Sequence, residues 1–362
     1  MLSNIWWKLW GCVRPNHINN LADWQQMIIA SPRPVQHHWF IRQQKVYRMA
    51  DRRKSQMISE AMVDAKSRLL EDGVTDDAIT SAVDALVRKE SQAAKKEGRP
   101  HVYDFDDCWR SNKLMSSRID SDVARDELFG FLIAGHDTTS TTLQWGMKLL
   151  ADNHAPQSKL RDILHDNFAD ALHSKRAPSA EEIAKSSITY LDAVVEEVFR
   201  QAVTAAVIAR RAIVDTTLLG YHVPKGTDVY FMMNGPEVMQ APFPSTIDES
   251  VRSESSRATK DRIRAWDPSN VENFVPERWL STNEEGKEIF DLHAGPSMPF
   301  GGGPRGCFGK KLANLELKTV VTLLVWHFEL QACPPELSTY KKIDKLTHMP
   351  QQCYARLVRL TE

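Results

Sequence analysis

Residues 300–309 of this 362-residue chain read Phe-Gly-Gly-Gly-Pro-Arg-Gly-Cys-Phe-Gly, with the cysteine at position 307. Glycine permits turns with positive φ and lets the main chain approach a flat ligand closely. The following stretch, residues 310–328, reads as a long helix, so Cys307 is expected at a helix N-terminus, where the helix dipole stabilises a thiolate. These features favour a thiolate metal ligand held against a planar cofactor.

A glycine-rich loop before a helix can also bind phosphate, which is the alternative interpretation of the same residues. It fits less well, because the loop lacks the Gly-Lys-Ser/Thr ending of phosphate-binding loops.

The composition indicates a packed protein of balanced charge. Apolar residues make up 42% and charged residues 26%, and the formal net charge is −1. This balance gives no reason to expect nucleic acid as a partner. The cysteines are far apart and odd in number, which argues against a zinc site or a disulfide framework and favours a reducing compartment; they are Cys12, Cys108, Cys307, Cys333 and Cys353.

The fold is expected to be mainly α with a small β component. The longest apolar run, residues 121–153, predicts a buried helix with a polar group of residues at its centre. A capping-box pattern at Ser179 and Glu182 predicts the start of a short helix. Residues 207–232 change to strand-like spacing, and residues 234–294 are rich in loop-forming residues. Further helices are expected over residues 20–70, 75–96, 156–175, 190–201 and 310–328.

The first residues, 1–13, are apolar and rich in tryptophan, but they are too short to span a bilayer. A buried packing segment is the first interpretation, and contact with a membrane surface is the alternative, because tryptophan favours that zone.

The cysteine loop resembles the signature of the cytochrome P450 superfamily, F-x-x-G-x-R-x-C-x-G, at Phe300, Gly303, Arg305, Cys307 and Gly309. The resemblance implies a haem cofactor (heme, iron protoporphyrin IX) whose iron is ligated by the thiolate of Cys307. It also implies that Arg305 pairs with a haem propionate and that Phe300 packs near the sulfur.

Within the long central helix, residues 134–139 (Ala-Gly-His-Asp-Thr-Thr) resemble the family's A-G-x-D-T-T motif. A carboxylate inside an apolar run is costly unless it has a partner or a task. The resemblance gives Asp137 and Thr138 the role of delivering protons to bound oxygen.

Two weaker motifs follow in the family's order. Glu197 and Arg200 form E-x-x-R, which places both on one helical face. The segment Pro-Glu-Arg-Trp contains Arg278, which the resemblance adds to this pair as structural support of the haem-binding core. Such a buried group satisfies its charges only if all three residues are present.

A strand stretch containing Arg210 and Arg211, followed by a Pro-Lys-Gly turn, resembles the family's basic strand. Arg210 is the better candidate for a second propionate contact, judged by its spacing to Asp215, and Arg211 is the alternative.

The implied function is a haem-thiolate monooxygenase that inserts one oxygen atom from O₂ into a small apolar organic substrate, in fungal specialised metabolism. The implied electron donor is an NADPH-dependent reductase, for which Lys310, Lys311, Lys318 and residues 42–53 offer basic side chains. Substrate contacts are expected around Phe131, Ala134 and residues 203–208. The implied location is intracellular and, for a full-length chain, associated with the endoplasmic reticulum membrane.

Residues 1–362 are expected to form a single cytochrome P450 domain that lacks the family's usual N-terminal portion and its transmembrane anchor. This departure puts activity in doubt, because a missing wall would expose apolar surface. A truncated, non-catalytic haem-binding remnant, or a partner-dependent pseudo-enzyme, is therefore the alternative function.

Overall fold

The computed structural model describes residues 122–233, 248–259, 266–267, 269–344 and 346–360, with residues 56, 60, 61, 63–65, 67, 68, 84, 88 and 92 nearer the N-terminus. The chain divides into two compact units, residues 1–134 and 135–362, and each unit is considered by itself. The single domain expected over residues 1–362 stays a prediction.

In the first unit, all the described residues are helical. Arg68 Nη2 lies 2.8 Å from Oδ1 of Asp84, whose carboxylate is buried. The tryptophan-rich residues 1–13 and the basic residues 42–53 lie outside the described part of the chain.

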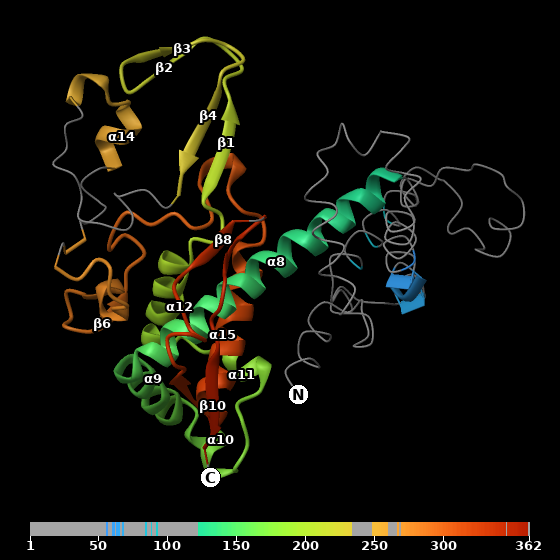
Figure 1. Cartoon of the computed structure of the whole chain (residues 1–362), viewed down its shortest axis with the longest axis vertical. Helices are drawn as coiled ribbons and strands as arrows, with labels where there is room; N and C mark the ends of the chain where they lie inside the picture. Colours follow the sequence, from blue (N-terminus) through green and yellow to red (C-terminus); the bar gives the residue numbers. More distant parts are fainter. Residues whose placement is uncertain are drawn as a thin grey trace, which may run out of the picture. The chain divides into compact units, whose positions relative to one another are not determined.

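Helices are the main regular structure of the second unit (Figure 1). The expected helix over residues 156–175 is two helices, because Phe168 leaves the helical conformation with φ −113° and ψ 40°. Its buried ring packs edge-on against Trp326, a tertiary contact that local spacing does not encode. The helices are α8 (Asp122–Asp152), α9 (His154–Asn167), α10 (Ala169–His173), α11 (Ala180–Lys185), α12 (Thr189–Ala202), α14 (Glu254–Thr259) and α15 (Lys310–His327).

The capping box at the start of α11 is confirmed. The Ser179 side chain accepts a hydrogen bond from the Glu182 amide at 3.2 Å, and the Glu182 carboxylate accepts one from the Ser179 amide at 2.7 Å. Two amides that the first helical turn leaves without a partner are satisfied in this way.

The described strands pair only two at a time, and every pair is antiparallel: β1–β4, β2–β3, β5–β6, β7–β10 and β8–β9. Figure 1 shows β1 and β4 as a ribbon that carries β2 and β3 at its far end. The strands are β1 (Val207–Arg211), β2 (Thr216–Leu218), β3 (Tyr221–Val223), β4 (Asp228–Met232), β5 (Leu280–Thr282), β6 (Glu288–Phe290), β7 (Phe328–Ala332), β8 (Lys342–Asp344), β9 (His348–Pro350) and β10 (Ala355–Arg359). The expectation of a mainly α fold with a small β component is confirmed.

The core of the second unit is built around α12, which contacts α9, α15, β5, β6 and the 3₁₀ turn η6 (Pro276–Trp279). Almost every residue of α12 is buried, including the charged Glu196, Glu197 and Arg200. A helix that is buried on nearly all sides must satisfy such charges inside the protein, and this requirement shapes the site described below.

The loop-rich region after β4 contains more structure than the sequence predicts. Its described part includes α14, the turns η4 (Glu249–Val251) and η6, and the β5–β6 hairpin. These elements are three to six residues long, so tertiary contacts rather than local periodicity determine them. Among the described residues, no helix combines the length and apolar character needed to cross a membrane.

Candidate active site

The glycine loop that carries Cys307 is a compact turn. Gly301 and Gly303 both have φ +64°, a conformation that strongly favours glycine. The Gly306 amide donates to the Gly303 carbonyl at 3.0 Å, and the Cys307 amide donates to the Phe300 carbonyl at 2.8 Å. These two hydrogen bonds hold the backbone of the loop in a closed turn and thereby fix the position of the Cys307 Cα atom.

Cys307 lies three residues before α15, which begins at Lys310, and its free thiol group belongs to an exposed residue. A side chain added at Gly309 would have its Cβ 3.9 Å from the Cys307 sulfur, in ordinary van der Waals contact. The thiol is therefore held at the start of a helix and stays accessible to a ligand.

Phe300 anchors the loop to the core. Its ring packs edge-on against Phe199 of α12, with ring centroids 4.7 Å apart. The ammonium group of Lys310 lies 5.7 Å from the centroid of the same ring. Phe300 thus connects the cysteine loop to α12 and to the first turn of α15.

Of the two arginines in β1, Arg210 turns toward the cysteine loop. Its Nη2 donates to the Arg305 carbonyl at 3.4 Å, and its Nη1 donates to the Ala209 carbonyl. Arg305 itself lies in the turn η7 (Gly303–Arg305) and is exposed. The loop and β1 therefore bring two guanidinium-bearing residues to one place.

Arg211 is paired elsewhere. Its guanidinium makes two hydrogen bonds to Asp228 of the neighbouring strand, at 2.7 and 2.9 Å. These bonds raise the pKa of Arg211 and lower the pKa of the Asp228 carboxyl. Asp215, whose spacing favoured Arg210 in the sequence, accepts a hydrogen bond from the Lys225 amide instead.

Asp137 and Thr138 lie on α8, separate in sequence from the cysteine loop. The Asp137 carboxylate is largely buried, and Nδ1 of His136 lies 3.5 Å from its Oδ1. The Thr138 carbonyl accepts a hydrogen bond from the hydroxyl of Thr142 at 2.8 Å. Phe131 and Ala134, expected near the substrate, belong to the first unit.

Glu197, Arg200 and Arg278 form one buried ionic group. The two oxygens of Glu197 accept hydrogen bonds from Arg200 at 2.8 and 2.7 Å, and Arg278 donates to Oε1 at 3.1 Å. Burial lowers the pKa of Arg278, and the Glu197 carboxylate opposes this shift. The carbonyl of Asn273 accepts hydrogen bonds from both arginines.

This group depends on all its members. The side chains of Glu197 and Arg200 are fully buried and that of Arg278 is 6% exposed. Removing one partner of such a group typically costs about 3–5 kcal/mol, because the charges that remain are buried without compensation. The group fixes the segment around η6 against α12.

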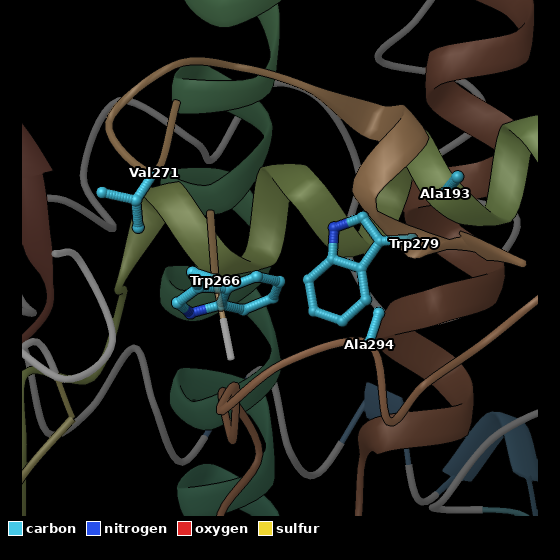
Figure 2. Packing of buried hydrophobic residues seen from close by; sticks show 5 residues of the cluster. All are labelled: Ala193, Trp266, Val271, Trp279 and Ala294. Atoms are coloured by element: carbon cyan, nitrogen blue, oxygen red, sulfur yellow. The ribbon is translucent and has the colours of Figure 1, made fainter. Parts of the chain in front are cut away.

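Trp266 and Trp279, to which the sequence motifs assign no role, complete this region. The Trp279 indole donates to the second oxygen of Glu197 at 2.9 Å. Trp266 packs edge-on against Trp279, with centroids 5.2 Å apart, within the cluster of Figure 2. A Cβ at Gly295 would lie 2.4 Å from the Trp266 ring, so only glycine fits there. The sequence feature that could have pointed to Trp279 is its place in the Pro-Glu-Arg-Trp segment, directly after Arg278.

The loop residues fit a haem group. An exposed cysteine on a glycine-rich loop can supply the single sulfur ligand that a haem iron takes from the protein. The exposed thiol offers that ligand, and Arg210 and Arg305 offer cations for carboxylates. Phe308, which adjoins Cys307, is 92% exposed, as expected of an apolar residue that a flat ligand would cover.

The described part of the chain therefore defines a mainly helical protein with a thiol-bearing glycine loop braced against its core. The cytochrome P450 family model matches residues 19–242 and 264–353, and the chain belongs to the cytochrome P450 family, whose members carry haem.

Three fungal relatives are similar to this chain over most of its length. A cytochrome P450 monooxygenase of Pestalotiopsis microspora is 43% identical over 79% of this chain and 47% of its own length. The cytochrome P450 monooxygenase TRI13 of Fusarium sporotrichioides is 39% identical over 87% of this chain and 53% of its own length. The Hps1-dma1 cluster cytochrome P450 monooxygenase cyp3.1 of Dothistroma septosporum is 37% identical over 86% of this chain and 98% of its own length. The chain thus spans about half the length of the first two.

Proposed function

We propose that the protein is a haem-thiolate monooxygenase that inserts one oxygen atom from O₂ into a small apolar organic substrate. The observation that carries the proposal is the placement of Cys307. Its exposed thiol is fixed by the bond from its own amide to the Phe300 carbonyl, at the start of α15, with Arg210 turned toward the same loop. An accessible sulfur just before a helix, on a loop that a glycine-rich turn holds in place, is suited to bind a metal.

The residues of the loop have distinct tasks. Cys307 would bind the iron through its sulfur. A Cβ built on Gly303 would meet no other atom within 4 Å, so the loop stays open there to a flat ring. Arg210 and Arg305 bind the propionates, and Phe300 keeps the loop on α12. When bound, haem supplies the oxygen chemistry, and the thiolate favours cleavage of the O–O bond.

Asp137 and Thr138 supply protons. Asp137 is largely buried, with its Oδ1 3.5 Å from Nδ1 of His136, and a positioned carboxyl group can deliver a proton as a general acid. The Thr138 hydroxyl can pass that proton on, since a hydroxyl both accepts and donates.

The partner and the location follow from the same proposal. Electrons come from an NADPH-dependent reductase, for which the exposed Lys310 and Lys311 offer a basic contact. Lys318 is less available, because it pairs with Asp192. The proposed location is inside the cell, at the endoplasmic reticulum membrane. Its role in fungal specialised metabolism is supported by the fungal relatives, one of which is named for a cluster.

A non-catalytic haem-binding remnant is the second candidate, and a specific observation favours it. The second unit exposes several large apolar residues: Phe308 in the cysteine loop at 92%, Ile213 just after β1 at 81% and Tyr221 in β3 at 77%. Proteins rarely expose so much apolar surface to water. In a non-catalytic remnant, a partner chain could cover this surface.

The test is turnover of the haem-supplied protein with a cytochrome P450 reductase, NADPH and a panel of apolar compounds, read as products that are one oxygen atom heavier. We expect oxygenated product from the wild type and loss of at least tenfold for Asp137→Asn, which removes the charge and keeps the shape. Haem uptake without product from any compound would support the remnant instead, and absence of haem uptake would overturn both candidates.

A further inference from the structure

The hydroxyl groups of Thr142 and Thr204 are hydrogen-bonded to each other next to the turn of α8 that carries Asp137 and Thr138. The Thr142 hydroxyl lies 2.8 Å from the Thr138 carbonyl and 2.7 Å from the Thr204 hydroxyl. Thr142 is 4% exposed, whereas Thr138 and Thr204 are partly exposed.

The direction of these hydrogen bonds follows from the chemistry of the groups. A carbonyl oxygen only accepts, so Thr142 must donate its one hydroxyl proton to Thr138. Thr204 must then be the donor to Thr142. The order is fixed as Thr204 hydroxyl to Thr142 hydroxyl to Thr138 carbonyl.

Thr204 is itself held from several sides. Its carbonyl accepts a hydrogen bond from the His348 amide at 3.0 Å, and the His348 carbonyl accepts one from the Trp145 indole, one turn beyond Thr142 on α8. The residue before it, Val203, has φ +41°, a left-handed conformation that β-branched residues rarely adopt. The surroundings of Thr204 therefore fix its position closely.

A hydroxyl that bonds back to the carbonyl four residues earlier bends a helix locally. Here that bond falls on Thr138, so it acts on the turn that presents the groups assigned to proton delivery. We propose that Thr142 and Thr204 are positioning residues, which set the backbone of this turn and thereby the direction of the Asp137 and Thr138 side chains. The importance of that direction rests on the proposed function.

The first test needs no haem. It measures hydrogen exchange of the α8 peptide covering residues 138–145 in Thr204→Val, Thr204→Ser and Thr142→Val. We expect about fivefold faster exchange in both valine variants, which corresponds to about 1 kcal/mol at 1.4 kcal/mol per tenfold. The serine variant keeps the hydroxyl and should stay within about twofold of the wild type.

Thr319→Val is the matched control. Thr319 is buried in α15 and bonds back to the Leu315 carbonyl at 2.7 Å, so its loss should change exchange in α15 and leave residues 138–145 unchanged. Unchanged exchange of residues 138–145 in Thr204→Val would overturn the proposal. An effect of Thr204→Ser as large as that of Thr204→Val, or faster exchange spread equally over α15, would overturn it as well.

The second test uses the haem-supplied, reduced protein and reads the stretching frequency of bound carbon monoxide. We expect Thr204→Val and Thr142→Val to shift this frequency in the same direction, and the combined change Asp137→Asn with Thr138→Val to remove the dependence on Thr204. Persistence of the Thr204 effect when both side chains are changed would contradict the positioning role. If no haem is taken up, the proposed function fails, while the exchange measurement still decides this inference.

Discussion

Two adjacent arginines of β1 make different contacts, although their sequence context alone left both as candidates for a propionate contact. Successive side chains of a strand point to opposite faces, so Arg210 and Arg211 cannot share one partner. The register of β1 with β4 places Arg211 opposite Asp228, whereas Arg210 lies opposite Val229 and reaches the Arg305 carbonyl. The pairing register of β1 with β4, which the local sequence does not determine, therefore decides which of the two arginines is free of the ion pair with Asp228.

This difference predicts unequal effects of the same substitution. Arg210→Gln should weaken haem binding by about 10- to 100-fold, because a charge-assisted hydrogen bond contributes about 1.5–3 kcal/mol. Arg211→Gln removes the same charge from the neighbouring position and should change haem affinity by less than about threefold. Haem titration followed by visible absorbance measures both constants, and equal losses would refute the assignment of Arg210.

At the scale of elements, the sequence predicts the long helices well. The helix expected over residues 121–153 is α8, and the one expected over residues 190–201 is α12, each within a residue or two of its observed ends. Both carry long apolar runs, which are strong signals. The break at Phe168 and the β5–β6 hairpin could not be predicted, because packing against other elements decides them.

The buried site of α12 was predictable only in part. The spacing of Glu197 and Arg200 indicates one helical face, and the family motif adds Arg278. The contributions of Trp279 and of the Asn273 carbonyl come from a segment more than seventy residues away, so no local pattern reveals them.

Helix α12 also carries Glu196, a second buried carboxyl group. Burial raises its pKa to about 7, while Lys310 opposes the shift and Glu197 and Asp192 add to it. The same carboxyl in an unfolded chain titrates near 4.5. Between these values the folded state holds a proton that the unfolded chain has lost. The contribution of Glu196 to the free energy of unfolding is therefore most favourable below about pH 4.5 and is lost as the pH rises to about 7.

Glu196→Gln should remove this dependence. We expect the variant to be more stable than the wild type by about 3 kcal/mol above pH 7, with the difference shrinking toward pH 4.5. Urea unfolding across this pH range gives the comparison. Glu181→Gln, at an exposed position of α11, should follow the wild type at every pH. Parallel curves for Glu196→Gln and the wild type would show that Glu196 is not a destabilising buried acid.

At the scale of the whole molecule, the second unit combines a well-packed helical core with an exposed apolar surface near the cysteine loop. Leu160, Leu164, Val194 and Leu330 are fully buried, whereas Phe308 is almost fully exposed. A ligand that binds only the folded state stabilises it by mass action. Haem would cover part of the exposed surface, so its binding would both stabilise the folded state and supply the proposed chemistry.

The most direct test of the central claim is the visible spectrum of the haem-supplied protein, reduced under carbon monoxide. We predict a strongly red-shifted Soret band for the wild type, because the Cys307 sulfur ligates the iron as a thiolate. Cys333→Ser, which alters another free cysteine, should keep this band, whereas Cys307→Ser should lose it. A wild-type band without the red shift, or a red-shifted band that survives in Cys307→Ser, would contradict the assignment of Cys307 as the haem ligand.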